Sequence, residues 1–339
     1  MLQYAELLHQ TRLIRPPRHL FEFRPPRPWP SGSTPPAIVD LATYVEVHQR
    51  ADDKIKGYLE DPRAHHRETA SYDAIFNLRR ENAHALYANN NNSRIAFVEI
   101  ALKHILEHQH IKLGPCCYVT FTPAQFAFCM EDHGIVGRGE RSQARLASEA
   151  GKFNLLSLQN MAREALRGVP FVGIAEVALY RHWSASGWAP FDTASWHLHL
   201  LTWGGTADDI RPLLMPLRKR HVSLLRNVSA VHVEDVVEGA LERKICYSLK
   251  APQKLYRVEY WRDPGNVSTD PLISPGSWRT NKDWLRTGSR VRLLDILADR
   301  TLDQLLFGND DGTDLVRGIR SEALAPFNRW APKQRWYRH

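Results

Sequence analysis

Residues 195–203 read SWHLHLLTW, an apolar run that carries two histidines one residue apart, His197 and His199. In a β-strand successive side chains point to opposite faces, so both imidazoles would lie on the same face of a sheet. Neutral imidazole binds divalent metals well, and two converging imidazoles make half of a metal site. The run therefore predicts a strand with a metal-binding face. The alternative is a partly buried pair of hydrogen-bonded histidines.

The composition is that of a globular protein with an excess of positive charge. The chain has 339 residues, of which 43% are hydrophobic and 10% aromatic, enough for a real core and for two or three structural units. Its net charge of +8 and its isoelectric point near 9.4 favour a polyanionic partner such as nucleic acid.

Cysteine usage and hydropathy predict the compartment. Two of the four cysteines are adjacent and no CxxC pair occurs, so we expect a reducing compartment rather than a disulfide framework. The N-terminus lacks the apolar core of a signal peptide, and no apolar run approaches membrane-spanning length. These features predict a cytoplasmic protein with no membrane partner.

Changes in composition predict four segments. Residues 1–37 hold two Arg-Pro-Pro-Arg repeats and form a basic, proline-rich arm or linker, which either tethers other elements or contacts phosphates. Residues 38–110 form a helical N-terminal region, and residues 111–260 form the core. Residues 261–339 form a C-terminal extension, for which DNA binding is one interpretation.

The C-terminal extension has weaker structural signals than the core. Residues 261–283 are expected to be mainly loops, and residues 289–306 to form an amphipathic helix. Residues 329–338 interleave cations with aromatics, a mixture that suits stacking on single-stranded bases. The alternative is a terminus that packs its tryptophans on the core.

The core alternates between strand and helix signals. Expected strands cover 116–122, 171–180, 195–203 and 228–233, and expected helices cover 141–167, 207–225 and 235–250. The order β-α-β-β-α-β-α is the split pattern of a ferredoxin-like or RRM-like antiparallel sheet with helices on one face. The predicted fold class is therefore α+β, with one open sheet face available for a site.

Glu176 stands inside the otherwise apolar strand expected over 171–180. An isolated carboxylate there would lose its hydration, so it needs a cation or hydrogen-bond donors. If this strand neighbours the histidine strand, Glu176 completes a set of two histidines and one carboxylate that could hold a metal. The alternative is a salt bridge to an arginine on a helix.

A tyrosine and three lysines recur at helical spacing beyond the strands. Lys244, Tyr247, Lys250 and Lys254 stand at i, i+3, i+6 and i+10, so one helix face would carry them all. A free phenol has a pKa of about 10 and is a poor nucleophile at neutral pH. Nearby ammonium groups and a metal favour the phenolate and attract phosphate. The alternative is a solvated basic face with a surface tyrosine.

Together these motifs resemble the HUH endonuclease superfamily, in the arrangement of rolling-circle replication initiators. The family's first motif, an apolar strand with threonines, resembles residues 118–122, Tyr-Val-Thr-Phe-Thr. The second, His-hydrophobic-His, is matched by 197–199, and the third, a helical tyrosine with a lysine three residues on, by Tyr247 and Lys250. Glu176 matches the glutamate that precedes the histidine strand in plasmid initiators.

The resemblance covers residues 112–257 and rests on short motifs in an informative order. Histidines before tyrosine is the order of initiators, whereas conjugative relaxases place the tyrosine first. Residue 251 is alanine, so the double-tyrosine form is not matched and a single nucleophile is implied.

The resemblance implies a residue-by-residue mechanism. Glu176, His197 and His199 would hold Mg²⁺ or Mn²⁺ at the scissile phosphate. Tyr247 would attack phosphorus, giving a 5′-phosphotyrosine linkage and a free 3′-OH, and Lys250 would stabilise the phenolate or the transition state. The strand could then be rejoined without ATP.

The substrate implied is single-stranded or locally melted origin DNA, which Lys244 and Lys254 would help to bind. The chain has no phosphate-binding Gly-x-x-x-x-Gly-Lys-[Ser/Thr] motif, so a host helicase and polymerase are expected partners for replicating a plasmid or phage-like replicon. Three alternatives remain: a transposase of the same superfamily, a non-catalytic nucleic-acid-binding protein, and a metal-dependent hydrolase using activated water. The sequence leaves the oligomeric state open.

Overall fold

The computed structural model describes most of the chain. The described residues are 36–61, 74, 78, 86–108, 110–111, 114–130, 153–184, 187–188, 191–225, 228–262, 276–298 and 300–334. Nearly all of the arm expected over 1–37 lies outside them, as do the first part of the helix expected over 141–167 and the side chains of 329–338.

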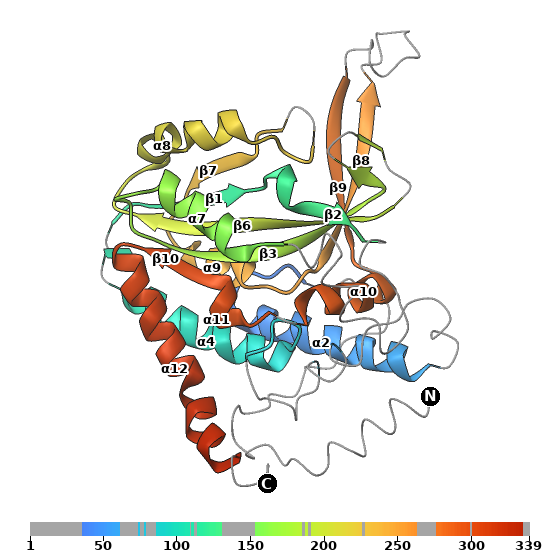
Figure 1. Cartoon of the computed structure of the whole chain (residues 1–339), viewed down its shortest axis with the longest axis vertical. Helices are drawn as coiled ribbons and strands as arrows, with labels where there is room; N and C mark the ends of the chain where they lie inside the picture. The colour runs from blue at the N-terminus through green and yellow to red at the C-terminus, as the bar shows by residue number, and fades with distance from the viewer. Residues whose placement is uncertain are drawn as a thin grey trace.

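A mostly antiparallel sheet forms the centre of the molecule (Figure 1). Its strands are β1 Cys116–Phe121, β2 Ala127–Cys129, β3 Phe171–Arg181, β6 Thr193–Trp203, β7 Val231–Asp235, β8 Lys254–Arg262, β9 Gly276–Trp284 and β10 Leu306–Asn309. The main path runs β7-β1-β6-β3-β8-β9, while β2 pairs with β6 and β10 pairs with β3. Among the described pairs, only β3 and β8 run parallel. β4 (Trp183–Ser184) and β5 (Gly187–Trp188) form a separate two-stranded ribbon.

β6 lies in the middle of the sheet because its apolar run can be buried on both faces. It pairs with β1 along one edge and with β3 along the other. This register places Thr120 opposite His199 and Glu176 opposite His197, so all four side chains belong to one face. The strand expected over 195–203 is confirmed and begins two residues earlier.

Helices cover both faces of the sheet. They are α2 Leu41–Glu60, α4 Asn91–Glu107, α7 Leu155–Ala165, α8 Ala207–Arg220, α9 Leu241–Ser248, α10 Thr287–Leu297, α11 Leu302–Leu305 and α12 Asp311–Gln334. α7 and α8 pack on one face, whereas α9 lies on the histidine face with α4 and α2 behind it (Figure 1). The prediction of helices on one face only is wrong, because the histidine face also carries apolar residues that need cover. Ile174 and Leu201 on that face share a hydrophobic cluster with Ile245 of α9 and Ile105 of α4.

The tyrosine helix is shorter than expected. α9 covers 241–248 rather than 235–250, because a turn with Gly239 at φ +75° separates it from β7. It ends at a cap on Leu249, three residues before Pro252. Lys250 and Lys254 therefore lie beyond the helix, and the prediction that they share its face with Tyr247 is wrong.

The C-terminal extension is more regular than expected. The loops expected over 261–283 give way at 276–284 to β9, which pairs with β8 as a long hairpin that projects from the sheet (Figure 1). The helix expected over 289–306 divides into α10 and α11, and Leu306 begins β10. The sequence did not predict β8 and β9, because their polar and aromatic residues lack a clear apolar period.

One hydrophobic core crosses the expected segment boundaries at 110 and 260. It joins Phe97 of α4, Val119 of β1 and Phe307 of β10. Within residues 38–110 the described helices are α2 and α4, and Tyr87 forms an isolated bridge with Thr301. No described helix has the length and apolar character needed to cross a membrane.

Candidate functional site

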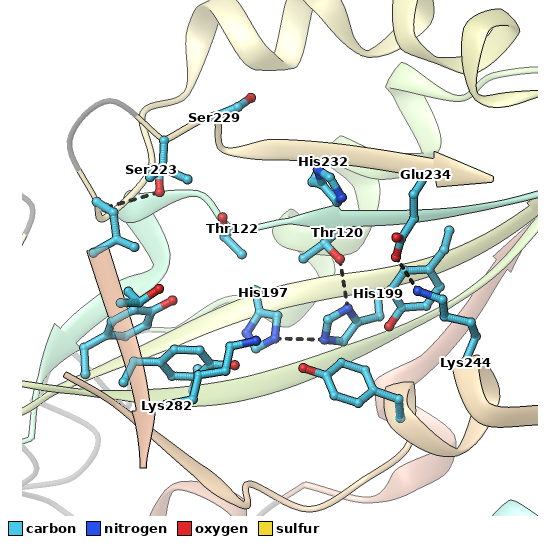
Figure 2. A pocket seen from close by; sticks show the side chains of 18 of the residues that line it. Thr120, Thr122, His197, His199, Ser223, Ser229, His232, Glu234, Lys244 and Lys282 are labelled. Atoms are coloured by element: carbon cyan, nitrogen blue, oxygen red, sulfur yellow. Dashed lines mark hydrogen bonds and ion pairs between the residues drawn. The ribbon is translucent and has the colours of Figure 1, made fainter. Parts of the chain in front are cut away.

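Glu176, His197 and His199 converge on the face of the sheet that α9 partly covers. The ligand atoms of the three side chains lie within 4.8 Å of one another, and all three residues are buried. His199 Nε2 is 2.9 Å from Glu176 Oε2. The Nε2 atoms of His197 and His199 are 3.1 Å apart, a contact drawn as a dashed line in Figure 2. This group could hold a metal ion, because two imidazoles and a carboxylate present three ligand atoms to one point.

The outer nitrogen of each imidazole also has a partner. Thr120 Oγ1 lies 3.3 Å from His199 Nδ1, and the Ser195 carbonyl lies 3.4 Å from His197 Nδ1 (the first pair is drawn in Figure 2). Such outer contacts orient metal-binding histidines. Burial lowers the pKa of His199 to about 4, so the ring is neutral at pH 7, as a ligand must be.

Lys250 is the counter-ion of Glu176. Its Nζ lies 2.6 Å from each carboxylate oxygen, and both side chains are buried. Burial alone would raise the pKa of Glu176, but the ammonium of Lys250 and the hydrogen bonds from His197 and His199 hold it well below its usual range. The carboxylate is therefore ionised, and its cationic partner is a lysine that follows α9 rather than an arginine on a helix.

Tyr247 extends from α9 beside the histidines. Its ring centroid is 5.8 Å from that of His199, and Lys250 Nζ lies 3.9 Å from the ring centroid. Tyr256 of β8 lines the same pocket, and burial raises its pKa well above the usual value. The predicted nucleophile, its lysine and the predicted metal ligands are thus brought together from β3, β6 and the end of α9.

A pocket of about 530 Å³ opens in front of these groups (Figure 2). Four tyrosines contribute to its walls: Tyr118, Tyr180, Tyr247 and Tyr256. Tyr180 and Tyr256 are stacked with centroids 5.0 Å apart. Polar and basic side chains complete the lining, among them Thr120, Thr122, His232, Arg243, Lys244 and Lys282.

The two lysines predicted to bind DNA occupy different environments. Lys244 lines the pocket, pairs with Glu234 and lies over the ring of Tyr118, with Nζ 4.7 Å from the centroid. Lys254 is not among the lining residues; its Nζ lies 3.4 Å from the ring centroid of Trp284 in the hairpin.

Several residues of the site were not singled out from the sequence. Thr120 lies within the strand motif 118–122. Alternation along the strand places it on the same face as Tyr118 and Thr122, and that pattern could have marked it. Tyr180 and Tyr256 had no distinguishing pattern, and Lys282 fell in the segment expected to be loops.

Comparison with known proteins adds no relative. No protein-family profile, no curated protein and no solved structure matches the chain. A fold alone does not assign a function, which lies in the residues of the site.

Proposed function

We propose that this protein nicks and rejoins single-stranded DNA through a 5′-phosphotyrosine intermediate, as an HUH endonuclease that initiates rolling-circle replication of a plasmid or phage-like replicon. The observation that carries the proposal is the position of Tyr247. Its ring lies against His199, one of the three candidate metal ligands Glu176, His197 and His199, here called the metal-ligand group. The same ring lies under the ammonium of Lys250, at the wall of an open pocket. A nucleophile, a charge-stabilising cation and a metal-ligand group in contact form the minimum set for this chemistry.

The strand order supports the HUH fold as part of the proposal. The order β7-β1-β6-β3, with antiparallel neighbours throughout, is the arrangement of a ferredoxin-like βαββαβ unit. The histidine pair stands on a central strand of that unit, between β1 and the strand of Glu176.

Glu176, His197 and His199 would hold Mg²⁺ or Mn²⁺. The donor set fits a divalent cation, because the carboxylate is ionised, the His199 ring is neutral, and the three ligand atoms already converge. When bound, such a cation supplies charge neutralisation at the scissile phosphate. Thr120 and the Ser195 carbonyl would keep the histidines oriented toward it.

Tyr247 would attack the phosphorus atom through its phenolic oxygen. The new bond joins that oxygen to phosphorus, the bond from phosphorus to the 3′ oxygen breaks, and the proton lost by the phenol is balanced by the one that the 3′-OH gains. Lys250, whose ammonium lies 3.9 Å from the ring centroid of Tyr247, would stabilise the charge that develops in the transition state. The linkage retains the energy of the phosphodiester, so attack by a 3′-OH reverses the step and joins the strand.

The pocket supports single-stranded rather than fully paired DNA as the substrate. Its tyrosine walls offer rings for unstacked bases, and each stacked base typically contributes about 1–3 kcal/mol. Lys244 and Lys282 line the same pocket and would neutralise phosphates. Strand opening and synthesis would come from a host helicase and polymerase.

Covalent trapping tests the proposal. The full-length protein would be mixed with 3′-labelled single-stranded DNA from its own locus and Mn²⁺, then run on a denaturing gel. We expect a labelled protein-sized band that is lost in Tyr247→Phe and in His197→Ala/His199→Ala. The matched control Tyr180→Phe, which alters another pocket tyrosine, should still form the adduct.

Each other outcome points to a different chemistry. Cleavage without an adduct would identify a hydrolase that uses water. DNA retention with neither adduct nor cleavage, across several candidate origins, would identify a binding protein. An adduct that persists in Tyr247→Phe would assign the nucleophile to another residue.

A further inference from the structure

Two buried side chains from the N-terminal helices meet at the carbonyl of Leu249. Tyr44 of α2 donates its hydroxyl to this oxygen at 2.8 Å, and Arg94 of α4 donates Nη1 to it at 2.7 Å. Leu249 caps the C-terminus of α9, where carbonyls lack partners within the helix. The peptide unit that precedes Lys250 is therefore held by two donors.

A third buried side chain holds the peptide unit on the other side of Lys250. The N–H of Ala251 donates to His48 Nε2 at 2.9 Å. Since this nitrogen accepts, the proton of the neutral ring is on Nδ1, which donates to the Tyr44 carbonyl at 2.7 Å. The His48 ring also stacks on Tyr44, with centroids 3.9 Å apart. Its orientation is thus fixed by two hydrogen bonds and one stacked ring.

These contacts are made inside the protein rather than at its surface. Tyr44 and His48 have no exposed area, and Arg94 is 3% exposed. Asn91 of α4 donates to Asp52 of α2 at 2.6 Å, which joins the two helices behind the contacts. Burying a phenol, an imidazole and a guanidinium at one point is costly unless they are hydrogen-bonded. The Tyr44 hydroxyl, both ring nitrogens of His48 and both terminal nitrogens of Arg94 have partners.

The location of the contacts gives them a role. Lys250 lies outside α9, so no helical hydrogen-bond ladder sets its backbone. Its Nζ must nevertheless reach both oxygens of Glu176 and the ring of Tyr247. A long side chain is placed reproducibly only when its backbone is immobilised, and the three contacts immobilise the peptide unit on each side of it.

We infer that Tyr44, His48 and Arg94 are positioning residues that hold Lys250 against Glu176 and Tyr247. The part that concerns catalysis rests on the proposed function; the part that concerns Lys250 and Glu176 does not. On this inference α2 and α4 complete the site by fixing the backbone around Lys250.

Lysine labelling tests the inference in the full-length, metal-free protein without DNA. Acetic anhydride would be added at limiting concentration, and acetylation would be followed by peptide mass spectrometry. Lys103, whose side chain is 53% exposed, is the reference, and Lys244 reports on α9 as a whole. In the wild type we expect Lys250 to react at least about tenfold more slowly than Lys103, because its ammonium is buried in an ion pair.

The variants remove single contacts. Tyr44→Phe should raise the labelling rate of Lys250 about fivefold, as expected for the loss of one hydrogen bond. His48→Leu should raise it further because the N–H of Ala251 loses its acceptor, and His48→Gln should restore most of the protection. The labelling of Lys244 should not change in any of them.

Two results would overturn the inference. One is a labelling rate of Lys250 that is unchanged in both Tyr44→Phe and His48→Leu. The other is a labelling rate of Lys244 that rises together with that of Lys250. In that case the contacts would hold the whole of α9 against α2 and α4 rather than position Lys250 alone.

A cleavage assay on the same variants separates this inference from the proposed function. If both hold, Tyr44→Phe lowers kcat with little change in KM, because DNA binding does not involve the hydroxyl. If the labelling results are as expected but the wild type forms no adduct, the proposed function fails and the placement of Lys250 stands.

Discussion

Acid should destabilise this protein through His48, and the size of the effect follows from the contacts of the ring. His48 is fully buried, donates from Nδ1 and accepts at Nε2, so an added proton would displace the N–H of Ala251. Burial is the main cause that lowers the pKa of His48, from 6.5 to about 3. The perturbation is His48→Gln, which keeps an acceptor but removes the titrating group.

The sign of the effect follows from proton binding in the two states. Between pH 6.5 and 3 the unfolded chain binds a proton at His48 and the folded protein does not. The stability that the neutral His48 ring contributes is therefore fully present above pH 6.5. As the pH is lowered below that value, the free energy of unfolding falls by about 1.4 kcal/mol per pH unit, because the unfolded chain then binds a proton at His48. From pH 8 to pH 5 the loss from His48 alone is about 2 kcal/mol.

Urea unfolding at pH 8 and pH 5, with a chelator present, measures this loss. The free energy of unfolding of the wild type should fall about 2 kcal/mol more than that of His48→Gln. His199, whose pKa burial lowers to about 4, adds a similar loss to both proteins and cancels in the comparison. An equal loss in wild type and His48→Gln would refute the reasoning.

Two further predictions concern the metal-ligand group. Thr120→Val removes the partner of His199 Nδ1 and should weaken Mn²⁺ binding about tenfold in a calorimetric titration. Lys250→Met leaves Glu176 buried without its ammonium, so the free energy of unfolding in chelator should fall by about 3 kcal/mol in urea melts. Adding Glu176→Gln to Lys250→Met should recover most of this loss, because the unpaired charge is then gone.

Each of these predictions has its own control. Thr122→Val makes the same change two residues along β1, in the same pocket, and should bind Mn²⁺ like the wild type. Equal weakening in both threonine variants would mean that the hydrogen bond to His199 does not orient it. Losses that simply add in the Lys250 and Glu176 double variant would show that the two side chains are energetically independent.

The strands that carry the metal-ligand group were predictable because the signal is local. Alternation along a strand places His197 and His199 on one face whatever the rest of the chain does. The unusual carboxylate in an apolar strand likewise marked Glu176 as needing a partner, and the structure supplies Lys250 and both histidines.

The end of the tyrosine helix was not predictable from spacing. Tyr247 and Lys250 are three residues apart, and the pattern suits a continuous helix. The helix instead stops at Ser248, and the orphan carbonyl of Leu249 finds donors in α2 and α4. Those donors are more than 150 residues away in the sequence, so no local pattern could indicate them.

The sequence by itself determined an α+β protein with a buried strand that presents two histidines on one face and a glutamate in a neighbouring segment. These are properties of backbone alternation and of the cost of burying charge, which act within a few residues. Tertiary structure decided that β3 and β1 flank that strand, that helices cover both faces, and that Lys250 is the counter-ion of Glu176. Strand neighbours and side-chain partners depend on contacts between segments far apart in the chain, and those contacts exist only when the whole core has packed.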